Sequence, residues 1–341
     1  MDMENAAQLC RENLQAMEMY ARLLRMEEEC FSADEIDDFA KVCGLEKETA
    51  FHLLSASACG LEPDRKHEDK HLMMRYLVPA LKKQDAACFR QNPYYSKIKF
   101  PEASLGEWRM TQLSYAPYQI FPCGDTVLLP DGREIAPMGY FTEGFSFPAV
   151  TENGREWMAI KPNETETMKE PIQAAYGNAV VFGLGLGYYA FMVSEKENVS
   201  SVTVIERDKN VISLFQEYLL PQFPRGDKIR IVQADAFDYL KHEMRHNAFD
   251  FAFADIWHDI SDGLPLYLKF RKAEQACPGV QFKYWIEPSM LVFLRSLMLE
   301  DWLAHAGRLD RLLSPDCFAD EFCSLAFVRQ TAPEIDPAEL W

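Results

Sequence analysis

Three acidic residues in the second half of the chain have the types and spacing of a nucleotide-binding site. Glu206 ends the run VSSVTVIE, Asp235 follows KIRIVQA, and Asp255 ends FDFAFAD. A carboxylate at the tip of a strand can accept the hydroxyl hydrogens of a ribose or the amino group of a base, and it can take a proton from a reacting group. We expect Glu206 to bind a ribose and Asp235 to accept from an adenine amino group. Asp255 is predicted beside the reactive end of the ligand, as a candidate catalytic base.

A glycine-rich turn precedes the three acids. The segment VVFGLGLGYYAFM carries Gly183, Gly185 and Gly187, which separate an apolar strand from a helix that begins at Tyr188. Glycine tolerates positive φ and lets a ligand approach the backbone more closely than a side chain would allow. The sequence therefore predicts a strand, a nucleotide-binding loop that includes Leu184, and a helix.

A parallel sheet is needed to bring these groups together. From Ala179 onward strand patterns alternate with helical ones, which is typical of a Rossmann-like, doubly wound, mostly parallel α/β sheet. The predicted strands are Ala179–Phe182, Ser201–Ile205, Lys228–Val232, Phe249–Ala254 and Val280–Ile286. The first four strands each end in a ligand group, at the edge where open α/β sheets bind ligands. Arg207 and the backbone N–H of Ala236, which follow two of the acids, are predicted to contact the same ligand.

The rest of the chain divides by pattern into two further parts. Residues 1–108 are predicted to form a helical N-terminal domain, because apolar residues recur every three or four positions and no proline occurs before Pro63. Residues 109–170 carry short β-type runs between turn signals and are predicted to form a small β-rich subdomain or lid. Residues 171–341 are assigned to the Rossmann-like domain.

Two short helices joined at Gly44 are predicted inside the helical domain, with Ser32 as the N-cap of the first. Their spacing is compatible with a helix-turn-helix. The second helix, however, begins with Glu46, Lys47 and Glu48, where a DNA-reading helix needs basic and amide side chains. The pattern therefore favours a plain helical hairpin over a DNA-binding motif.

The composition limits the classes of partner. The chain has 341 residues, enough for about two domains, and its formal net charge of −18 disfavours nucleic acid and anionic membranes as partners. The N-terminus lacks a secretory signal pattern, and no apolar run reaches the length of a membrane span. The nine cysteines form no CxxC pair, which favours reduced thiols. We expect a cytoplasmic protein with a small-molecule substrate and no bound metal. A protein partner of the helical domain stays open, and the oligomeric state is not predicted.

At its four strand tips, the sequence resembles the class I S-adenosylmethionine-dependent methyltransferases, and its layout is similar to the spermidine synthase-like branch of that superfamily. The resemblance covers about residues 148–287. It implies that S-adenosyl-L-methionine is the cofactor, that the glycine loop wraps its methionine part, and that Glu206 and Asp235 bind its ribose and adenine. NAD is the alternative ligand of such a loop, but the G-x-G-x-G form and the acid on the third strand favour the methionine cofactor.

The resemblance leaves open whether a methyl or an aminopropyl group is transferred. Spermidine synthases carry an acidic residue within a GGGDGG loop, and this chain has Leu186 at that position, which argues against aminopropyl transfer. In favour of an amine substrate, Asp259 and Asp262 follow Asp255 closely, and the three acids can receive a cationic amine. The alternative is that Asp259 and Asp262 are solvated turn residues.

Four other residues are candidate contacts of a substrate. No NPPY or DPPY follows the fourth strand, where DIWH stands, so the enzymes that methylate amino groups of nucleic acid bases and of glutamine are disfavoured. Trp257 can wall the substrate pocket and His258 can take a proton, or they are an interface tryptophan and a surface histidine. Thr165 and Glu166, at the start of a helix before the glycine loop, can close over the methionine amino group. Simple helix capping by Asn163 or Thr165 is the alternative.

One motif indicates a different chemistry. The residues His67–His71 match H-E-x-x-H, in which two histidines on one helical face bind zinc. Both intervening residues are charged, and no third ligand is evident in the sequence. The pattern therefore favours an exposed, charged helix.

We expect a methyltransferase that uses S-adenosyl-L-methionine to methylate a small or amine-bearing substrate. An aminopropyltransferase similar to the spermidine synthases is the alternative enzyme. A non-catalytic module, in which the cofactor fold acts as a sensor and the helical domain binds a protein, is the third hypothesis.

Overall fold

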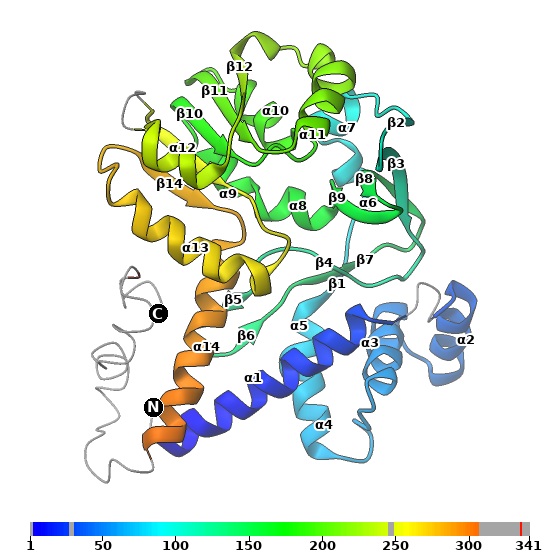
Figure 1. Cartoon of the computed structure of the whole chain (residues 1–341). Helices are drawn as coiled ribbons and strands as arrows, with labels where there is room; N and C mark the ends of the chain where they lie inside the picture. The colour runs from blue at the N-terminus through cyan, green and yellow to red at the C-terminus, as the bar shows by residue number, and fades with distance from the viewer. Residues whose placement is uncertain (1–2, 27–30, 245–248, 307–334, 336–341) are drawn as a thin grey trace. The chain divides into compact units, whose positions relative to one another are not determined.

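The computed structural model describes residues 3–26, 31–244 and 249–306, together with Ile335 (Figure 1). The chain divides into two compact units, each assembled from separate segments. The first unit takes Met1–Gln84, Tyr115–Gly144 and Pro288–Trp341, and the second takes Asp85–Ser114 and Phe145–Glu287. The predicted domains, 1–108, 109–170 and 171–341, are contiguous segments instead and stay a prediction.

A five-stranded parallel sheet forms the centre of the second unit. Its strands are β10 (Gly177–Phe182), β11 (Val199–Glu206), β12 (Ile229–Gln233), β13 (Phe251–Ala254) and β14 (Gln281–Tyr284). They lie in the order β12-β11-β10-β13-β14, and every neighbouring pair is parallel. Each of the five predicted strands overlaps one of these, which confirms a mixed α/β fold with a parallel sheet.

The order of the strands reverses beside β10. The chain runs outward from β10 to β11 and β12 on one side, and from β13 to β14 on the other. In open parallel sheets, the crevice that binds ligands lies at such a reversal, at the carboxyl ends of the strands. The glycine loop follows β10 at this point, and Glu206 is the last residue of the adjacent strand.

Helices cover both faces of this sheet (Figure 1). Those of the second unit are α6 (Ala86–Arg90), α7 (Pro93–Lys97), α8 (Pro162–Thr167), α9 (Lys169–Ala174), α10 (Tyr188–Ser194), α11 (Lys209–Leu214), α12 (Ala236–His242) and α13 (Ile260–Glu274). Tyr189 of α10 stacks on Phe253 with ring centroids 3.8 Å apart, whereas Phe182 contacts Phe270 of α13 with centroids 5.2 Å apart. Phe253 pairs in register with Val181, the neighbour of Phe182. Because successive side chains of a strand point to opposite faces, α10 and α13 cover opposite faces of the sheet.

A second sheet of this unit leads into the parallel one. Its strands, in spatial order, are β2 (Ala103–Leu105), β3 (Trp108–Tyr115), β8 (Phe145–Glu152) and β9 (Arg155–Ala159). The pairs β2–β3 and β8–β9 are antiparallel. Asn153 and Gly154, which join β8 to β9, both have positive φ, as a tight hairpin turn requires, and this confirms the turn predicted there.

Irregular helical turns complete the second unit between β11 and β12. A π-helix, η2 (Phe215–Leu219), continues α11, and two 3-10 turns follow, η3 (Leu220–Gln222) and η4 (Gly226–Lys228). Phe215 packs edge-on against Phe223 with ring centroids 5.3 Å apart. Aromatic side chains therefore pack these turns against one another.

The first unit combines helices with short strands. Its helices are α1 (Met3–Leu24), α2 (Ala33–Cys43), α3 (Lys47–Ala58), α4 (His67–Leu72), the π-helix η1 (Met73–Leu77), α5 (Val78–Ala80) and α14 (Glu287–Ala306). Its strands are β1 (Leu81–Lys83), β4 (Phe121–Pro122), β5 (Val127–Leu128), β6 (Glu134–Ile135) and β7 (Met138–Tyr140). The core gathers apolar residues of α1, α2, α3 and η1 with those of the short strands, among them Phe51 and Tyr76, both fully buried.

The sequence predicted part of this unit and missed a strand. Ser32 and Glu35 form a capping box at the start of α2, and Gly44 ends that helix with φ at +65°, which confirms the predicted helical hairpin. Residues 81–83 lie in the segment predicted as helical but form β1, which pairs in parallel with β7. Strand formation there depends on a partner distant in sequence, because strand preference follows packing more than local propensity.

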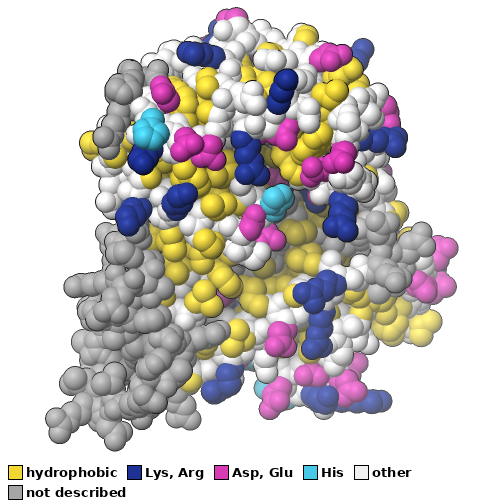
Figure 2. Space-filling view, viewed as in Figure 1, with side chains coloured by type: hydrophobic (Ala, Val, Ile, Leu, Met, Phe, Trp, Pro, Cys, Tyr) yellow, Lys and Arg dark blue, Asp and Glu magenta, His cyan; other side chains and the backbone are white. Residues whose placement is uncertain are grey.

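Two further features concern the helices and the surface of the described residues. Within residues 3–26, 31–244 and 249–306, no helix combines the length and apolar character needed to cross a membrane. On the face seen in Figure 2, lysine and arginine side chains are interspersed with acidic ones. Hydrophobic side chains lie between them, so this face carries basic, acidic and hydrophobic side chains without separation by type.

Candidate functional site

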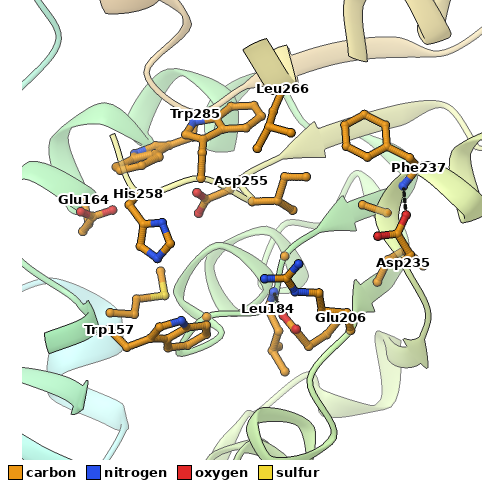
Figure 3. Close-up of a pocket in the computed structure, with 18 of the residues that line it drawn as sticks. Trp157, Glu164, Leu184, Glu206, Asp235, Phe237, Asp255, His258, Leu266 and Trp285 are labelled. Atoms are coloured by element: carbon orange, nitrogen blue, oxygen red, sulfur yellow. Dashed lines mark hydrogen bonds between the residues drawn. The ribbon is translucent and has the colours of Figure 1, made fainter. Parts of the chain in front are cut away.

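A cavity of about 540 Å³ opens at the carboxyl ends of the parallel strands (Figure 3). This volume is in the range of small-molecule sites. The residues that line it include Trp157, Lys161, Glu164, Gly183, Leu184, Gly185, Glu206, Arg207, Asp235, Ala236, Phe237, Asp255, Trp257, His258, Lys269 and Trp285. All the predicted site residues except Gly187, Asp259, Thr165 and Glu166 therefore line one cavity.

The cavity has two distinguishable ends (Figure 3). Asp235 and Phe237 lie at one end, which we call the Asp235 end. Glu164, Trp157 and Trp285 lie at the other, which we call the Glu164 end. Glu206 and Asp255 lie between the two ends in this view, so the tips of β11 and β13 meet near the middle of the cavity.

All three loop glycines have positive φ, as predicted: +98° at Gly183, +50° at Gly185 and +75° at Gly187. A Cβ atom on Gly183 would lie 1.9 Å from the carbonyl oxygen of Asp255, and one on Gly185 would lie 2.0 Å from the sulfur of Met158. The loop thus needs glycine both for its conformation and for packing against the chain itself. The close approach of a ligand to this loop stays a prediction.

Glu206 is held by backbone groups of two loops. Its side chain is 8% exposed, Oε2 accepts the N–H of Leu184 at 3.1 Å, and Oε1 accepts the N–H of Asp208 at 2.8 Å. A carboxylate oxygen has two lone pairs, so each oxygen keeps acceptor capacity for a further donor. The carboxylate therefore ties the glycine loop to the end of β11 and still offers acceptors to the cavity.

Asp235 caps the helix that follows β12. Its Oδ1 accepts the backbone N–H groups of Phe237 and Asp238 at 2.9 and 3.1 Å, which makes it the N-cap of α12. Ala236 is the first residue of the helix, where the backbone N–H has no acceptor within the helix. Asp235 Oδ2 and this N–H are thus an acceptor and a donor side by side. Phe237, with Lys269 Nζ 3.7 Å from its ring centroid, adjoins them in the cavity wall.

Asp255 follows β13 and lines the cavity with its carboxyl group. Its backbone N–H donates to the carbonyl oxygen of Phe182 at 2.8 Å, which fixes the residue beside the glycine loop. Among the described residues, none forms a hydrogen bond or an ion pair with this carboxyl group. Burial disfavours the charged form and raises the pKa of Asp255 from 3.8 to about 7. At neutral pH the group can therefore either hold or accept a proton.

Glu164 is a cavity residue that the sequence reasoning missed. It is the third residue of α8, after Pro162, and its pKa is raised well above 4.5, first by burial and then by the charge of Asp255. The charge of Lys161 partly opposes this rise. The motif PNETE contains two glutamates, and proline at the first turn of a helix was the available signal for its start. Nothing in so short a helix indicates which glutamate faces inward.

The two residues predicted in this helix lie elsewhere. Thr165 is 2% exposed and its hydroxyl donates to the carbonyl oxygen of Pro162 at 2.9 Å, within the first turn of α8. Glu166 forms an ion pair with Lys169 at 2.6 Å. Neither side chain lines the cavity, so the structure offers Glu164 in their place.

Asp259 and Asp262 form a helix cap. Asp259 is the N-cap of α13 and shares a capping box with Asp262, which corresponds to the alternative of solvated turn residues. Asp262 also accepts from His258, with Nδ1 and Oδ2 3.0 Å apart. Although partial burial opposes the effect, hydrogen bonds from Asp259 and His258 lower the pKa of Asp262. Only His258 of these three lines the cavity, with its side chain 68% exposed.

Two buried tryptophans differ in the state of their indole N–H. That of Trp285 donates to the hydroxyl of Thr167 at 2.8 Å. That of Trp257, whose side chain is 5% exposed, is buried with no acceptor among the described residues. Leu186, which occupies the acidic position of the polyamine enzymes, is 2% exposed and does not line the cavity; its carbonyl oxygen accepts from Tyr94.

The H-E-x-x-H residues belong to the first unit. They open α4, and both histidines line a second cavity of about 580 Å³ together with residues of α1. His71 Nε2 lies 3.4 Å from Oε2 of Glu12. In the part of the chain that the structure describes, no group of three or more His, Cys, Asp or Glu side chains is placed to hold a metal ion.

The chain is similar to the crystal structure of spermidine synthase from Thermotoga maritima, with 17% sequence identity and a TM-score of 0.30. The similarity covers 44% of this chain and 55% of that one, so the chain spans about half the length of the structure that it matches. No protein-family model matches the chain, and no curated protein matches it.

Proposed function

We propose that the cavity binds S-adenosyl-L-methionine and that the protein transfers the methyl group to a small acceptor. The observation that carries the proposal is the convergence of the glycine loop, Glu206, Ala236 and Asp255 on one cavity, at the reversal of strand order in a parallel sheet. Such a combination is typical of the crevice in which open parallel α/β sheets bind their ligands, which supports the proposal.

The residues of the cavity fit the parts of this cofactor. The free lone pairs of Glu206 can accept the two ribose hydroxyls, since its oxygens are already oriented by backbone N–H groups. Asp235 Oδ2 and the N–H of Ala236 match the donor and acceptor edge of adenine, and Phe237 offers a flat face beside them. The orphaned N–H of Trp257 is a further donor for a ligand acceptor. The Asp235 end would thus hold the nucleoside.

The protein itself has little chemistry to supply. When bound, the cofactor supplies an activated sulfonium methyl group. Trp157, Trp257 and Trp285 exclude water from the Glu164 end, and Asp255 can take a proton from an acceptor held there. Holding the reactants in line accounts for most of the catalytic benefit in such a reaction.

Calorimetric titration of the purified protein with S-adenosyl-L-methionine and with S-adenosylhomocysteine tests the proposal. Both should bind, and Glu206→Ala should weaken binding about 10- to 100-fold, because it removes hydrogen bonds to a charged group. Glu217→Ala is the matched control, since Glu217 is exposed and does not line the cavity. Absence of binding by the folded wild-type protein would refute the proposal.

Aminopropyl transfer is the second candidate. It is favoured by the two carboxyl groups of Glu164 and Asp255, which can receive an amine, and disfavoured by the buried Leu186. The same titration with decarboxylated S-adenosylmethionine separates the two candidates. Methyl transfer predicts equal or tighter binding of the intact cofactor, whereas a clear preference for the decarboxylated one would favour aminopropyl transfer.

A further inference from the structure

Two carboxyl groups meet at the Glu164 end of the cavity. Glu164 comes from α8 and Asp255 from the tip of β13; both line the cavity, and in Figure 3 the carboxyl group of Asp255 is directed toward the side on which Glu164 lies. Burial, and after it the charge of Asp255, raises the pKa of Glu164. The nucleoside contacts proposed above involve neither of these two carboxyl groups.

Backbone hydrogen bonds hold the main chain of both residues in place. The carbonyl oxygen of Glu164 accepts from the N–H of Met168 at 3.2 Å, and its neighbours Pro162 and Thr165 are buried. On the other side, the N–H of Asp255 donates to Phe182, and the preceding carbonyl oxygen, that of Ala254, accepts from Trp285 at 3.0 Å. The main-chain positions from which the two side chains enter the cavity are therefore fixed.

The two lysines of the cavity contact other residues, and its arginine is exposed. Lys161 forms an ion pair with Glu156 and only partly offsets the charge near Glu164. Lys269 lies over the ring of Phe237 at the Asp235 end. Arg207 is exposed at the tip of β11. Among the described residues, none forms an ion pair with Glu164 or Asp255.

The remaining charged or titratable groups of the cavity also have partners of their own. Glu206 accepts two backbone N–H groups, and Asp235 caps α12. His258 shares a hydrogen bond with Asp262. The surroundings therefore favour the neutral, protonated form of both carboxyl groups. Two neighbouring carboxyl groups in a desolvated site cannot both ionise without a compensating cation.

Aromatic side chains complete this end of the cavity. Trp157 and Trp285 lie at the Glu164 end, and Trp257 follows Asp255 by two residues in the same wall. The faces of indole rings attract organic cations, and they do so more strongly when the cation is desolvated. Carboxyl groups and indole rings together are the chemistry of a receptor for an organic cation.

We propose that Glu164 and Asp255 act as one proton-linked pair, in which both groups are protonated while this end of the cavity is empty and one proton is released to solvent when an organic cation enters. The inference rests on the proposed function and deepens it, since it makes a cationic group the occupant of the Glu164 end. The cation is either the sulfonium of the cofactor or the ammonium group of an amine acceptor. In both cases one positive charge enters and one proton leaves.

A ligand-free measurement tests the pair itself. Between about pH 5 and 7 the unfolded chain has lost the protons of both residues, whereas the native pair keeps them, so wild-type stability falls as pH rises. In Glu164→Gln the fall should be shallower by up to about one proton's contribution to the slope of unfolding free energy against pH. The matched control, Glu166→Gln on the same helix, should keep the wild-type slope. An unchanged slope in Glu164→Gln overturns the inference.

A second measurement on the wild-type protein identifies the source of the cation and does not depend on any variant folding. Calorimetric titrations near pH 6.5, in two buffers of different ionisation enthalpy, give the number of protons released on binding. S-adenosyl-L-methionine and S-adenosylhomocysteine differ in the sulfonium charge, and 1,4-diaminobutane added to the S-adenosylhomocysteine complex supplies an ammonium group. Greater release with the first ligand assigns the cation to the cofactor, and release with the diamine assigns it to the acceptor.

The outcomes separate the inference from the proposed function. Binding of both adenosyl ligands with equal proton release, and no release with the diamine, overturns the proton-linked pair and leaves cofactor binding intact. Failure of both ligands to bind overturns the proposed function. In that event the ligand-free slopes of wild type, Glu164→Gln and Glu166→Gln still decide whether the pair holds a proton.

Discussion

The tips of β11 and β12 hold their carboxyl groups in a different way from the tip of β13 and α8. Glu206 and Asp235 each accept two backbone N–H groups. Glu164 and Asp255 have raised pKa values, and no described residue pairs with their carboxyl groups. Backbone donors hold the first pair in place, whereas burial disfavours the ionised form of the second.

This difference separates two tasks within one cavity. Groups that only position a ligand can already be oriented by hydrogen bonds in the ligand-free protein, since rigidity favours binding. A group that exchanges a proton near neutral pH must instead have a pKa shifted toward that range, which usually costs stability. We therefore expect removal of a carboxylate to have opposite effects on stability in the two regions.

Gly183→Ala should have the largest effect, because Gly183 lies where the two regions meet. The residue combines φ at +98° with a Cβ position 1.9 Å from the carbonyl oxygen of Asp255, and backbone cannot move aside as a flexible side chain can. We expect a loss on the order of 3 kcal/mol or more, measured by urea unfolding. Gly154→Ala, with φ at +78° and no atom within 4 Å, is the control and should lose only about 1–2 kcal/mol. Equal losses would mean that the close packing of the loop has no energetic weight.

Asp255→Asn should stabilise the ligand-free protein at neutral pH. The pKa of Asp255 is about 7 in the folded protein, and its ordinary value is 3.8, so the native state keeps a proton between these values that the unfolded chain loses. Wild-type stability therefore falls as pH rises from about 4 to 7, and the variant escapes this contribution. The gain should be on the order of a few kcal/mol at pH 7, since each pKa unit corresponds to about 1.4 kcal/mol, and should vanish near pH 4. A difference independent of pH between the two proteins would contradict this reading of Asp255.

Glu206→Gln should have the opposite sign. The amide places an NH₂ group against one of the two backbone donors, those of Leu184 and Asp208, and removes the charge that strengthens both bonds. We expect a loss of about 1.5–3 kcal/mol in urea unfolding at pH 7. Glu217→Gln, at an exposed position outside the cavity, should leave stability almost unchanged. If Glu206→Gln instead stabilised the protein, the two regions would not differ in how their carboxyl groups affect stability.

Asp235→Ser should have the smallest effect on stability, because serine also serves as an N-cap. The variant loses the second carboxylate oxygen, so we expect S-adenosylhomocysteine to bind about 2- to 10-fold more weakly in calorimetry. Asp208→Ser is the matched control, since Asp208 caps α11 in the same manner but does not line the cavity. A similar loss of affinity in both variants would assign the effect to helix capping alone.

The parallel sheet could be predicted because its strands are apolar runs with clear boundaries. Val180–Phe182 is buried on both faces, and glycines mark its end, so strand, loop and helix follow from local sequence. The strand Leu81–Lys83 could not be predicted in this way, because two of its three residues are lysines and its order depends on pairing with β7. Local patterns identify elements that bury their own side chains, and they miss elements that tertiary pairing creates.

The candidate site shows the same limit. The strand tips predicted Glu206, Asp235 and Asp255, since the carboxyl ends of parallel strands meet at one edge. The choice between Glu164 and Glu166 depends on the rotational phase of a six-residue helix, which packing determines and sequence does not. The hydrogen bond from Leu184 to Glu206 joins residues of two successive strand tips, and it appears only once the loop is folded.

A crystal structure of the S-adenosylhomocysteine complex tests the central claim most directly, because it shows which end of the cavity holds each part of the ligand. We expect ribose hydroxyls on Glu206, adenine beside Ala236 and Phe237, and the sulfur directed toward Asp255 and the Glu164 end. A nucleoside bound at the Glu164 end, or a ligand bound outside this cavity, would contradict it.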